Sequence, residues 1–149
     1  MLIKTHLAIT VFFVLLFLPV VNHDIVFVIV ALVATFLPDV DSRHSTLGRK
    51  WWNRILQFFT KHRGVIHSFS FLLVISVIFA LFIPILALGF FLGYGLHLLG
   101  DSFTQGGISP FWPFRKMSSG GLRTGGKVEK LILTLFVILD ALLILLRVL

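Results

Sequence analysis

Long apolar runs separated by short polar breaks dominate this sequence. They predict five helices, at residues 5–21, 25–37, 67–83, 85–101 and 129–148, with Pro84 dividing the third from the fourth. A helix that crosses a bilayer needs about 20 apolar residues at a rise of about 1.5 Å each. We therefore expect short spanning helices that extend into their polar flanks. The fold class is expected to be all-α, a polytopic membrane protein with about five transmembrane helices.

The composition supports a membrane protein with one domain, residues 1–149. Hydrophobic residues make up 58% of the chain, more than one soluble core of this size hides. The first 21 residues resemble a signal peptide, but no small-x-small cleavage site precedes Asn22, so we expect a retained first helix. The chain has no cysteine, so any metal must be held by nitrogen and oxygen donors.

Two segments between the apolar runs have characters of their own. Residues 50–61 place Trp51, Ile55, Phe58 and Phe59 on one helical face, which predicts an amphipathic helix at the membrane interface. A helix packed on other loops is the alternative. Residues 102–127 form a loop rich in Gly and Ser, interpreted as a linker or a mobile lid.

The basic residues predict the orientation. Alternating crossings place all of the 13 Lys and Arg residues except Arg147 on the side of the N-terminus, and the positive-inside rule makes that side cytoplasmic. Nucleic-acid binding is the other explanation for a net charge of +7. We prefer the orientation signal and expect no specific nucleic-acid binding.

The segment Gly95–Asp101 carries the strongest local signal for a metal site. His97 and Asp101 are four residues apart, which places them on one helical face about one turn apart. Both are costly in an apolar segment without partners, so we interpret them as ligands of one ion. A His–Asp hydrogen bond joining two helices is the alternative. Gly93 and Gly95 are expected to allow close helix approach.

Two further motifs fall on the same side. His62 and His67 flank a short turn before the third helix, and neutral imidazoles bind zinc, iron, manganese or cobalt. Arg63 is suited to grip an anionic oxygen with its planar guanidinium. Asp39 and Asp41 follow the second helix at a spacing that allows two carboxylates to chelate one ion or bridge two. The alternatives are that the two histidines are ordinary surface residues and that Asp41 caps the next segment.

The remaining candidates are single residues. His6, at the head of the first helix, is on the same side as the motifs. His23 falls in the turn on the opposite side and is excluded. His44 lies in a basic stretch, and its role stays open. Asp140, inside the last apolar run, is expected to serve helix packing or an interfacial role.

These pieces together resemble a known family. The order is His6, Leu-Pro-Asp-x-Asp at 37–41, His-Arg-Gly-x-x-His-Ser at 62–68, and His-x-x-x-Asp at 97–101 followed by Thr104. It resembles the YdjM-like family of bacterial and archaeal inner-membrane proteins, described as membrane-bound metal-dependent hydrolases, from His6 to about Gly107.

A local resemblance and two departures qualify the ligand set. The stretch from Gly93 to Asp101 is similar to a helical motif of zinc-dependent phospholipase C and related single-strand nucleases, in which it binds a cluster of zinc ions that cleaves phosphoesters. Ile66 and Ser42 stand where many YdjM-like proteins have Thr and His. The number of ligands and of ions therefore stays open.

The motifs and the resemblance imply a metal-dependent hydrolase in the cytoplasmic (inner) membrane of a bacterium or archaeon. The expected metal ligands are His6, Asp39, Asp41, His62, His67, His97 and Asp101. The expected catalytic residues are Arg63, His97 and Asp101, and Ser68 and Thr104 are expected to donate hydrogen bonds to ligands.

The expected chemistry is hydrolysis assisted by divalent ions. Zinc is the first expectation and manganese, iron or cobalt the alternatives, with two or more ions. Membrane lipid is the expected partner, and a lipid-borne ester or phosphoester the expected substrate, with a soluble phosphoester as the alternative. A membrane protein whose metal only staples its helices, and a metal transporter, are the rival functions.

Overall fold

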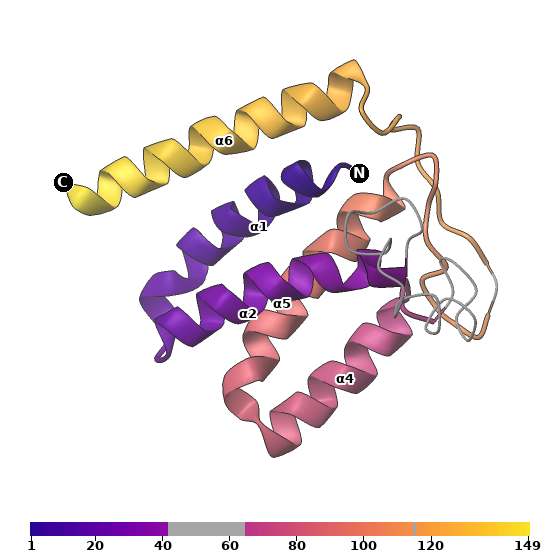
Figure 1. Ribbon diagram of the computed structural model, residues 1–149, viewed down its shortest axis with the longest axis horizontal. Coiled ribbons are helices and arrows are strands. Elements are labelled where there is room, and N and C mark those ends of the chain that lie inside the picture. The colour runs from indigo at the N-terminus through magenta and orange to yellow at the C-terminus, as the bar shows by residue number, and fades with distance from the viewer. Residues whose placement is uncertain (42–64, 115) are drawn as a thin grey trace.

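A computed structural model describes residues 1–41, 65–114 and 116–149 as a bundle of α-helices (Figure 1). The elements are α1 (Ile3–Phe17), the 3₁₀ turn η1 (Leu18–Val20), α2 (Asp24–Phe36), the 3₁₀ turn η2 (Leu37–Asp41), α4 (Phe69–Phe82), α5 (Pro84–Ser102) and α6 (Lys127–Val148). Strand pairing in the described ranges is limited to two isolated β-bridges. The prediction of an all-α fold is confirmed. The helix expected at 50–61 lies outside the described residues.

The number of helices long enough to cross a membrane is smaller than predicted. Three described segments are long and apolar enough, namely Ile3–Val20, Pro84–Ser102 and Lys127–Val148. Helices α2 and α4 have 13 and 14 residues, so each is only about 20 Å long, against about 30 Å of hydrocarbon. The prediction of about five short transmembrane helices is therefore wrong in their number. Polar breaks and prolines end α2 and α4 early.

Local sequence explains where several helices begin. Pro84 is the first residue of α5, where its missing N–H removes no helical hydrogen bond. Ser68 caps α4, because its Oγ accepts a hydrogen bond from the Phe71 amide at 3.1 Å. The carboxylate of Asp24 accepts the Ile25 amide at 2.9 Å at the start of α2. These starts fix which residues lie in the terminal turns.

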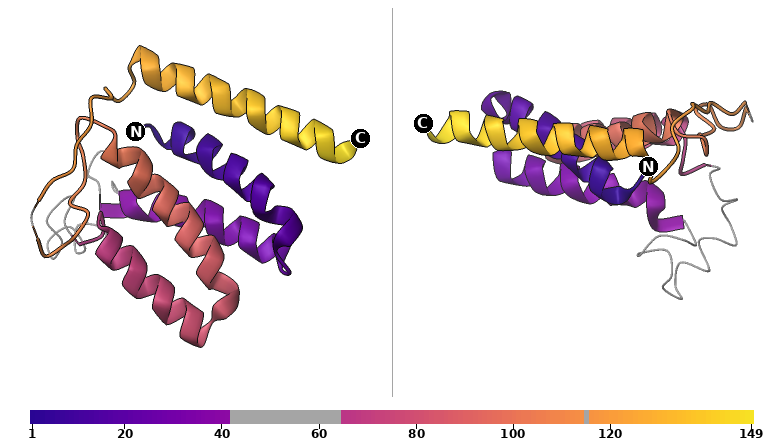
Figure 2. Two further views of the ribbon diagram at one scale, coloured as in Figure 1. Left: turned by 180° about the vertical axis from the view of Figure 1, so that it is seen from behind. Right: turned by 90° about the horizontal axis from the view of Figure 1, so that it is seen from above.

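The centre of the bundle is a close crossing of α2 and α5, seen from both sides in Figures 1 and 2. A Cβ at Gly93 would lie 2.0 Å from the Ala31 carbonyl oxygen, and one at Gly89 would lie 2.9 Å from the Phe27 carbonyl oxygen. Small residues four apart are a common device for close helix packing in membranes. The expectation for Gly93 is met, and Gly89 is its partner on the same face.

The other helices flank this crossing. Helix α6 runs beside α1 along one edge, and α4 packs against α5 on the other (Figure 1). The larger core cluster joins α2 and α5 to α4 and to the loop that follows α5. Its buried members are Ala34, Leu72, Phe90, Tyr94, Leu98 and Ile108. The N-terminus, the end of α5 and the start of α6 lie at one end of the bundle, and the C-terminus lies at the other.

The loop between α5 and α6 is folded back on itself. Ile108 and Ser118 exchange two backbone hydrogen bonds of 2.9 and 2.8 Å, and Thr104 and Leu122 form the second bridge. The Ile108 side chain is fully buried in the core. These contacts hold the loop over the end of the bundle that contains the N-terminus.

Candidate metal centre

The end of the bundle that contains the N-terminus gathers candidate ligands from four segments. His6 lies in the first turn of α1, Asp39 in η2, His67 just before α4, and His97 and Asp101 in the last turns of α5. His6, His67, His97 and Asp101 are at most 4% exposed. Residues up to 95 positions apart in the chain therefore share one buried site.

Asp101 is the residue on which the imidazoles converge. Its Oδ1 lies 3.2 Å from Nε2 of His6. Its Oδ2 lies 3.6 Å from Nε2 of His97 and 3.8 Å from Nε2 of His67. The N-terminal amine of Met1 also pairs with Oδ1. One carboxylate thus has nitrogen atoms facing both of its oxygens.

His97 is held in one orientation by the backbone of α2. Its Nδ1 lies 2.8 Å from the Thr35 carbonyl oxygen. A carbonyl only accepts hydrogen bonds, so Nδ1 carries a proton, and in the neutral imidazole Nε2 presents its lone pair to the site. Within the described residues, this buried Nε2 has no hydrogen-bond partner. An oriented, buried imidazole nitrogen of this kind suits a metal ion.

The donor atoms form two overlapping groups of three. His6, His97 and Asp101 make one group, and Asp39, His67 and His97 make the other, with all ligand atoms of a group within 4.8 Å of one another. The ring of His97 stacks on His6 at 4.0 Å and meets His67 edge-on at 5.8 Å. All donors are nitrogen or oxygen, so the set fits zinc or another first-row divalent ion.

A glycine makes the approach of α1 to α5 possible. A Cβ at Gly100 would lie 2.7 Å from Cε of Met1 and 3.0 Å from Cε1 of His6. A larger residue there would require the Met1 side chain and the His6 ring to shift. Gly100 therefore positions a candidate ligand although it donates none itself.

The other predicted site residues are placed as follows. Asp41 ends η2, and its side chain is not among the described ones, while His62, Arg63 and His44 lie outside the described residues. The Ser68 hydroxyl donates to the Val65 carbonyl at 2.6 Å. The Thr104 hydroxyl donates to the Asp101 carbonyl at 2.8 Å. Their role beside the ligands stays a prediction.

Two polar residues that sequence reasoning missed support this end of the bundle. Glu129, 1% exposed, accepts the amides of Leu2 and Gly125, each at 2.5 Å, and so ties the start of α1 to the start of α6. Thr35 bonds Thr10 at 2.9 Å, linking α2 to α1. For Thr35 the available signal was a lone polar residue inside an apolar run, whereas Glu129 stands between Lys127 and Lys130, where an acidic residue is unremarkable.

Comparison with known proteins places this site in a family. The sequence profile of the YdjM inner membrane proteins matches residues 1–148. The chain belongs to the YdjM inner membrane protein family. The predicted family is therefore confirmed, and with it the location in the inner membrane. No solved structure is similar to the chain at a significant level.

Relatives of this family member include the inner membrane protein YdjM of Escherichia coli K12 and that of Shigella flexneri. Each is 36% identical over 94 residues, which is 57% of this chain and 48% of the relative. The uncharacterized protein YvsG of Bacillus subtilis 168 is 29% identical over 107 residues, 68% of this chain and 67% of YvsG. The chain spans about half the length of the two YdjM proteins that it matches.

Proposed function

We propose that this protein is a membrane-bound metal-dependent hydrolase that cleaves a phosphoester or ester, preferably lipid-borne, at the cytoplasmic face of the inner membrane. The observation that carries the proposal is the convergence of His6, His67 and His97 on the buried carboxylate of Asp101. Ionisable groups inside an apolar bundle are expensive and usually serve a function. Asp39, 3.9 Å from Nε2 of His97, adds a second carboxylate.

Each residue has a proposed part in the reaction. Divalent ions at the site would lower the pKa of a bound water toward neutrality and polarise the scissile group. Asp101 and Asp39 are the proposed carboxylate ligands, and the Thr35 carbonyl would hold His97 in the orientation of a ligand. Arg63 is the proposed contact for the anionic part of the substrate. Asp41 and His62 complete the proposed ligand set.

The cytoplasmic orientation is part of the proposal. The described basic residues near the site end are Lys4, Lys116, Arg123, Lys127 and Lys130, and Arg147 lies in the last turn of α6 at the other end. Basic residues concentrate on the cytoplasmic side of membrane proteins. This distribution supports a site at the inner face, at the depth of lipid head groups.

One rival function has an observation in its favour. The donors come from four separate segments, so a bound ion could serve only to tie them together. A closed structural site needs four ligands, and the proposed set of seven exceeds that number. A transport site is expected near the membrane midplane, whereas these donors lie in terminal turns. We therefore place hydrolysis first.

The test compares two double variants in reconstituted vesicles. His97→Ala with Asp101→Ala removes the centre of the site, and His23→Ala with Asp24→Ala removes the same residue types at the exposed α1–α2 turn. Release of phosphate, head group or fatty acid is measured across lipid and soluble phosphoester panels. Turnover by the wild type and the control, lost in the site variant, is expected. Bound metal without turnover favours the structural function, and metal uptake into the vesicles favours transport.

A further inference from the structure

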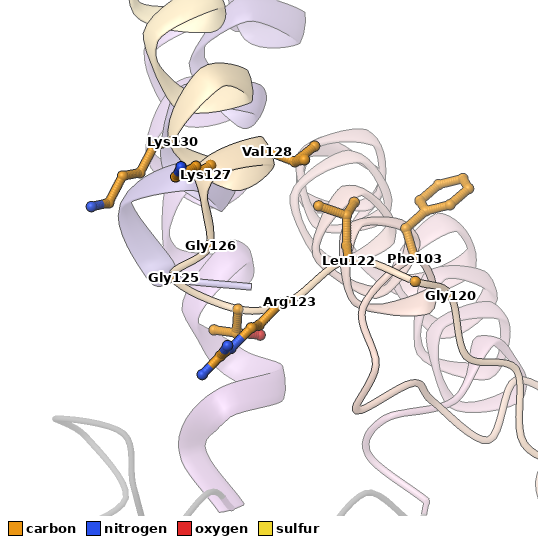
Figure 3. A pocket seen from close by; sticks show the side chains of 11 residues that line it. Phe103, Gly120, Leu122, Arg123, Gly125, Gly126, Lys127, Val128 and Lys130 are labelled. Atoms are coloured by element: carbon orange, nitrogen blue, oxygen red, sulfur yellow. The ribbon is translucent and has the colours of Figure 1, made fainter.

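A pocket of about 830 Å³ lies where the loop joins α6, beside the end of α5 (Figure 3). Its lining divides into two halves. Arg123, Lys127 and Lys130 extend on one side, and Phe103, Leu122 and Val128 lie on the other. Its size falls within the usual range for ligand sites. The pocket is thus amphipathic, with a cationic half and an apolar half.

A second, smaller cavity lies between three helices and shares two lining residues with this pocket. It has a volume of about 210 Å³. Its helical walls are Ile9 and Phe13 of α1, Leu96 and Leu99 of α5, and Ile132 and Phe136 of α6. Phe103 and Leu122 line both cavities. Every residue that lines this apolar groove is hydrophobic or glycine.

The apolar groove also reaches the metal centre. Met1 and Gly100 line it. The amine of Met1 pairs with Asp101, and Gly100 is packed against the His6 ring. One rim of the groove therefore lies within one residue of the candidate ligand Asp101.

We infer that the pocket and the groove together bind one anionic phospholipid of the surrounding membrane. One of its two acyl chains lies in the groove between α1, α5 and α6, and the phosphate lies at Arg123, Lys127 and Lys130. Charge complementarity supports this occupant, because each exposed Lys or Arg near a membrane surface attracts anionic lipid. As a statement about the substrate class the inference rests on the proposed hydrolase, but lipid binding does not depend on turnover.

The first test removes charge inside and outside the pocket. Lys127→Gln with Lys130→Gln is compared with Lys4→Gln with Lys116→Gln, which removes the same charge at the same end of the bundle but outside the pocket. The full-length protein is treated with chelator and titrated with phosphatidylglycerol, and bound lipid is counted by native mass spectrometry. The pocket variant is expected to bind about tenfold more weakly or worse. Equal weakening in both variants overturns the inference, since it indicates general surface attraction.

The second test fills the groove without changing charge. Ile132→Trp places a large ring in the groove, and Leu135→Trp places one on an exposed position of the same helix. Only Ile132→Trp is expected to reduce phosphatidylglycerol binding, by several fold. Phosphatidylcholine is expected to bind weakly to all variants. Equal binding of the two lipids, or displacement by millimolar glycerol phosphate, contradicts the inference.

These measurements fail separately from those of the proposed function. Lipid binding is measured on metal-free protein, and metal content is measured without added lipid. Metal binding and hydrolysis without selective lipid binding would contradict only the lipid-binding inference. Selective lipid binding by a protein that holds no metal would contradict only the proposed hydrolase function.

Discussion

At the scale of single residues, Asp101 and His97 organise the site. Asp101 has three imidazole nitrogens within 3.8 Å, and His97 belongs to both groups of candidate ligands. The sequence predicted that these two share a face, because the helical repeat fixes the distance between residues four apart. The Thr35 carbonyl that orients His97 could not be predicted, since every residue carries such a group and only packing selects one.

The position of His6 depends on a glycine, which gives a prediction at this scale. Gly100→Ala is expected to push the His6 ring away from Asp101, because the added Cβ would lie 3.0 Å from its Cε1. Metal affinity should fall by roughly 10- to 100-fold, as for other changes that disturb ligand orientation. Isothermal titration of the chelator-treated protein with zinc measures this. Gly121→Ala, with nothing within 4 Å, is the control, and equal affinities would contradict the account.

At the scale of helices, the crossing of α2 and α5 fixes the site. It positions η2, which holds Asp39, beside the end of α5, which holds His97. The sequence indicated Gly93 and Gly95 as points of close approach. Only Gly93 faces the α2 backbone, whereas Gly95 is in ordinary contact with Leu72 of α4. The sequence signal that distinguishes Gly93 from Gly95 is a second glycine, Gly89, four residues before Gly93 on the same helical face.

This difference predicts unequal effects of two similar substitutions. Gly93→Ala is expected to lower stability by about 1–3 kcal/mol or more, because a Cβ 2.0 Å from the Ala31 carbonyl forces two backbones apart. Gly95→Ala should be neutral or slightly stabilising, since alanine favours a helix and the nearest atom is 3.4 Å away. Thermal unfolding in detergent compares the two. A loss at position 95 as large as that at 93 would refute the described crossing.

Glu129 gives a second prediction for helix packing. Glu129→Ala removes the carboxylate that accepts the amides of Leu2 and Gly125, and a hydrogen bond to a charged group contributes about 1.5–3 kcal/mol. The contact between α1 and α6 should loosen, which faster hydrogen exchange at the start of both helices would reveal. Val128→Ala, exposed on the same turn, is the control. Unchanged hydrogen exchange in Glu129→Ala would show that the carboxylate does not hold the starts of α1 and α6 together.

At the scale of the whole molecule, much of the architecture followed from apolar runs and polar breaks. The helix positions agree with the expected ranges to within a few residues, because Pro84 and the polar turns interrupt the helices where the sequence indicates. The number of spans was overestimated, because polar breaks and prolines limit α2 and α4 to 13 and 14 residues. The meeting of His6 with Asp101 required tertiary packing that spacing alone does not give.

The orientation of the bundle is open to direct measurement. The chain has no cysteine, so single probes can be introduced as Ser118→Cys at the site end and Asn22→Cys at the opposite turn. A membrane-impermeant maleimide applied to spheroplasts should label only Asn22→Cys, because the positive-inside rule places the other probe in the cytoplasm. Both should label after lysis. The reverse pattern would place the site on the outer face.

The central claim is that buried histidines and aspartates hold divalent metal at one end of the bundle. Elemental analysis of the purified protein tests it most directly, with His97→Ala/Asp101→Ala as the site variant and His23→Ala/Asp24→Ala as the matched control. The account predicts at least one zinc, manganese, iron or cobalt ion per chain in the wild type and the control, and loss of that metal in the site variant. Folded wild-type protein without metal, or equal metal content in all three proteins, would contradict it.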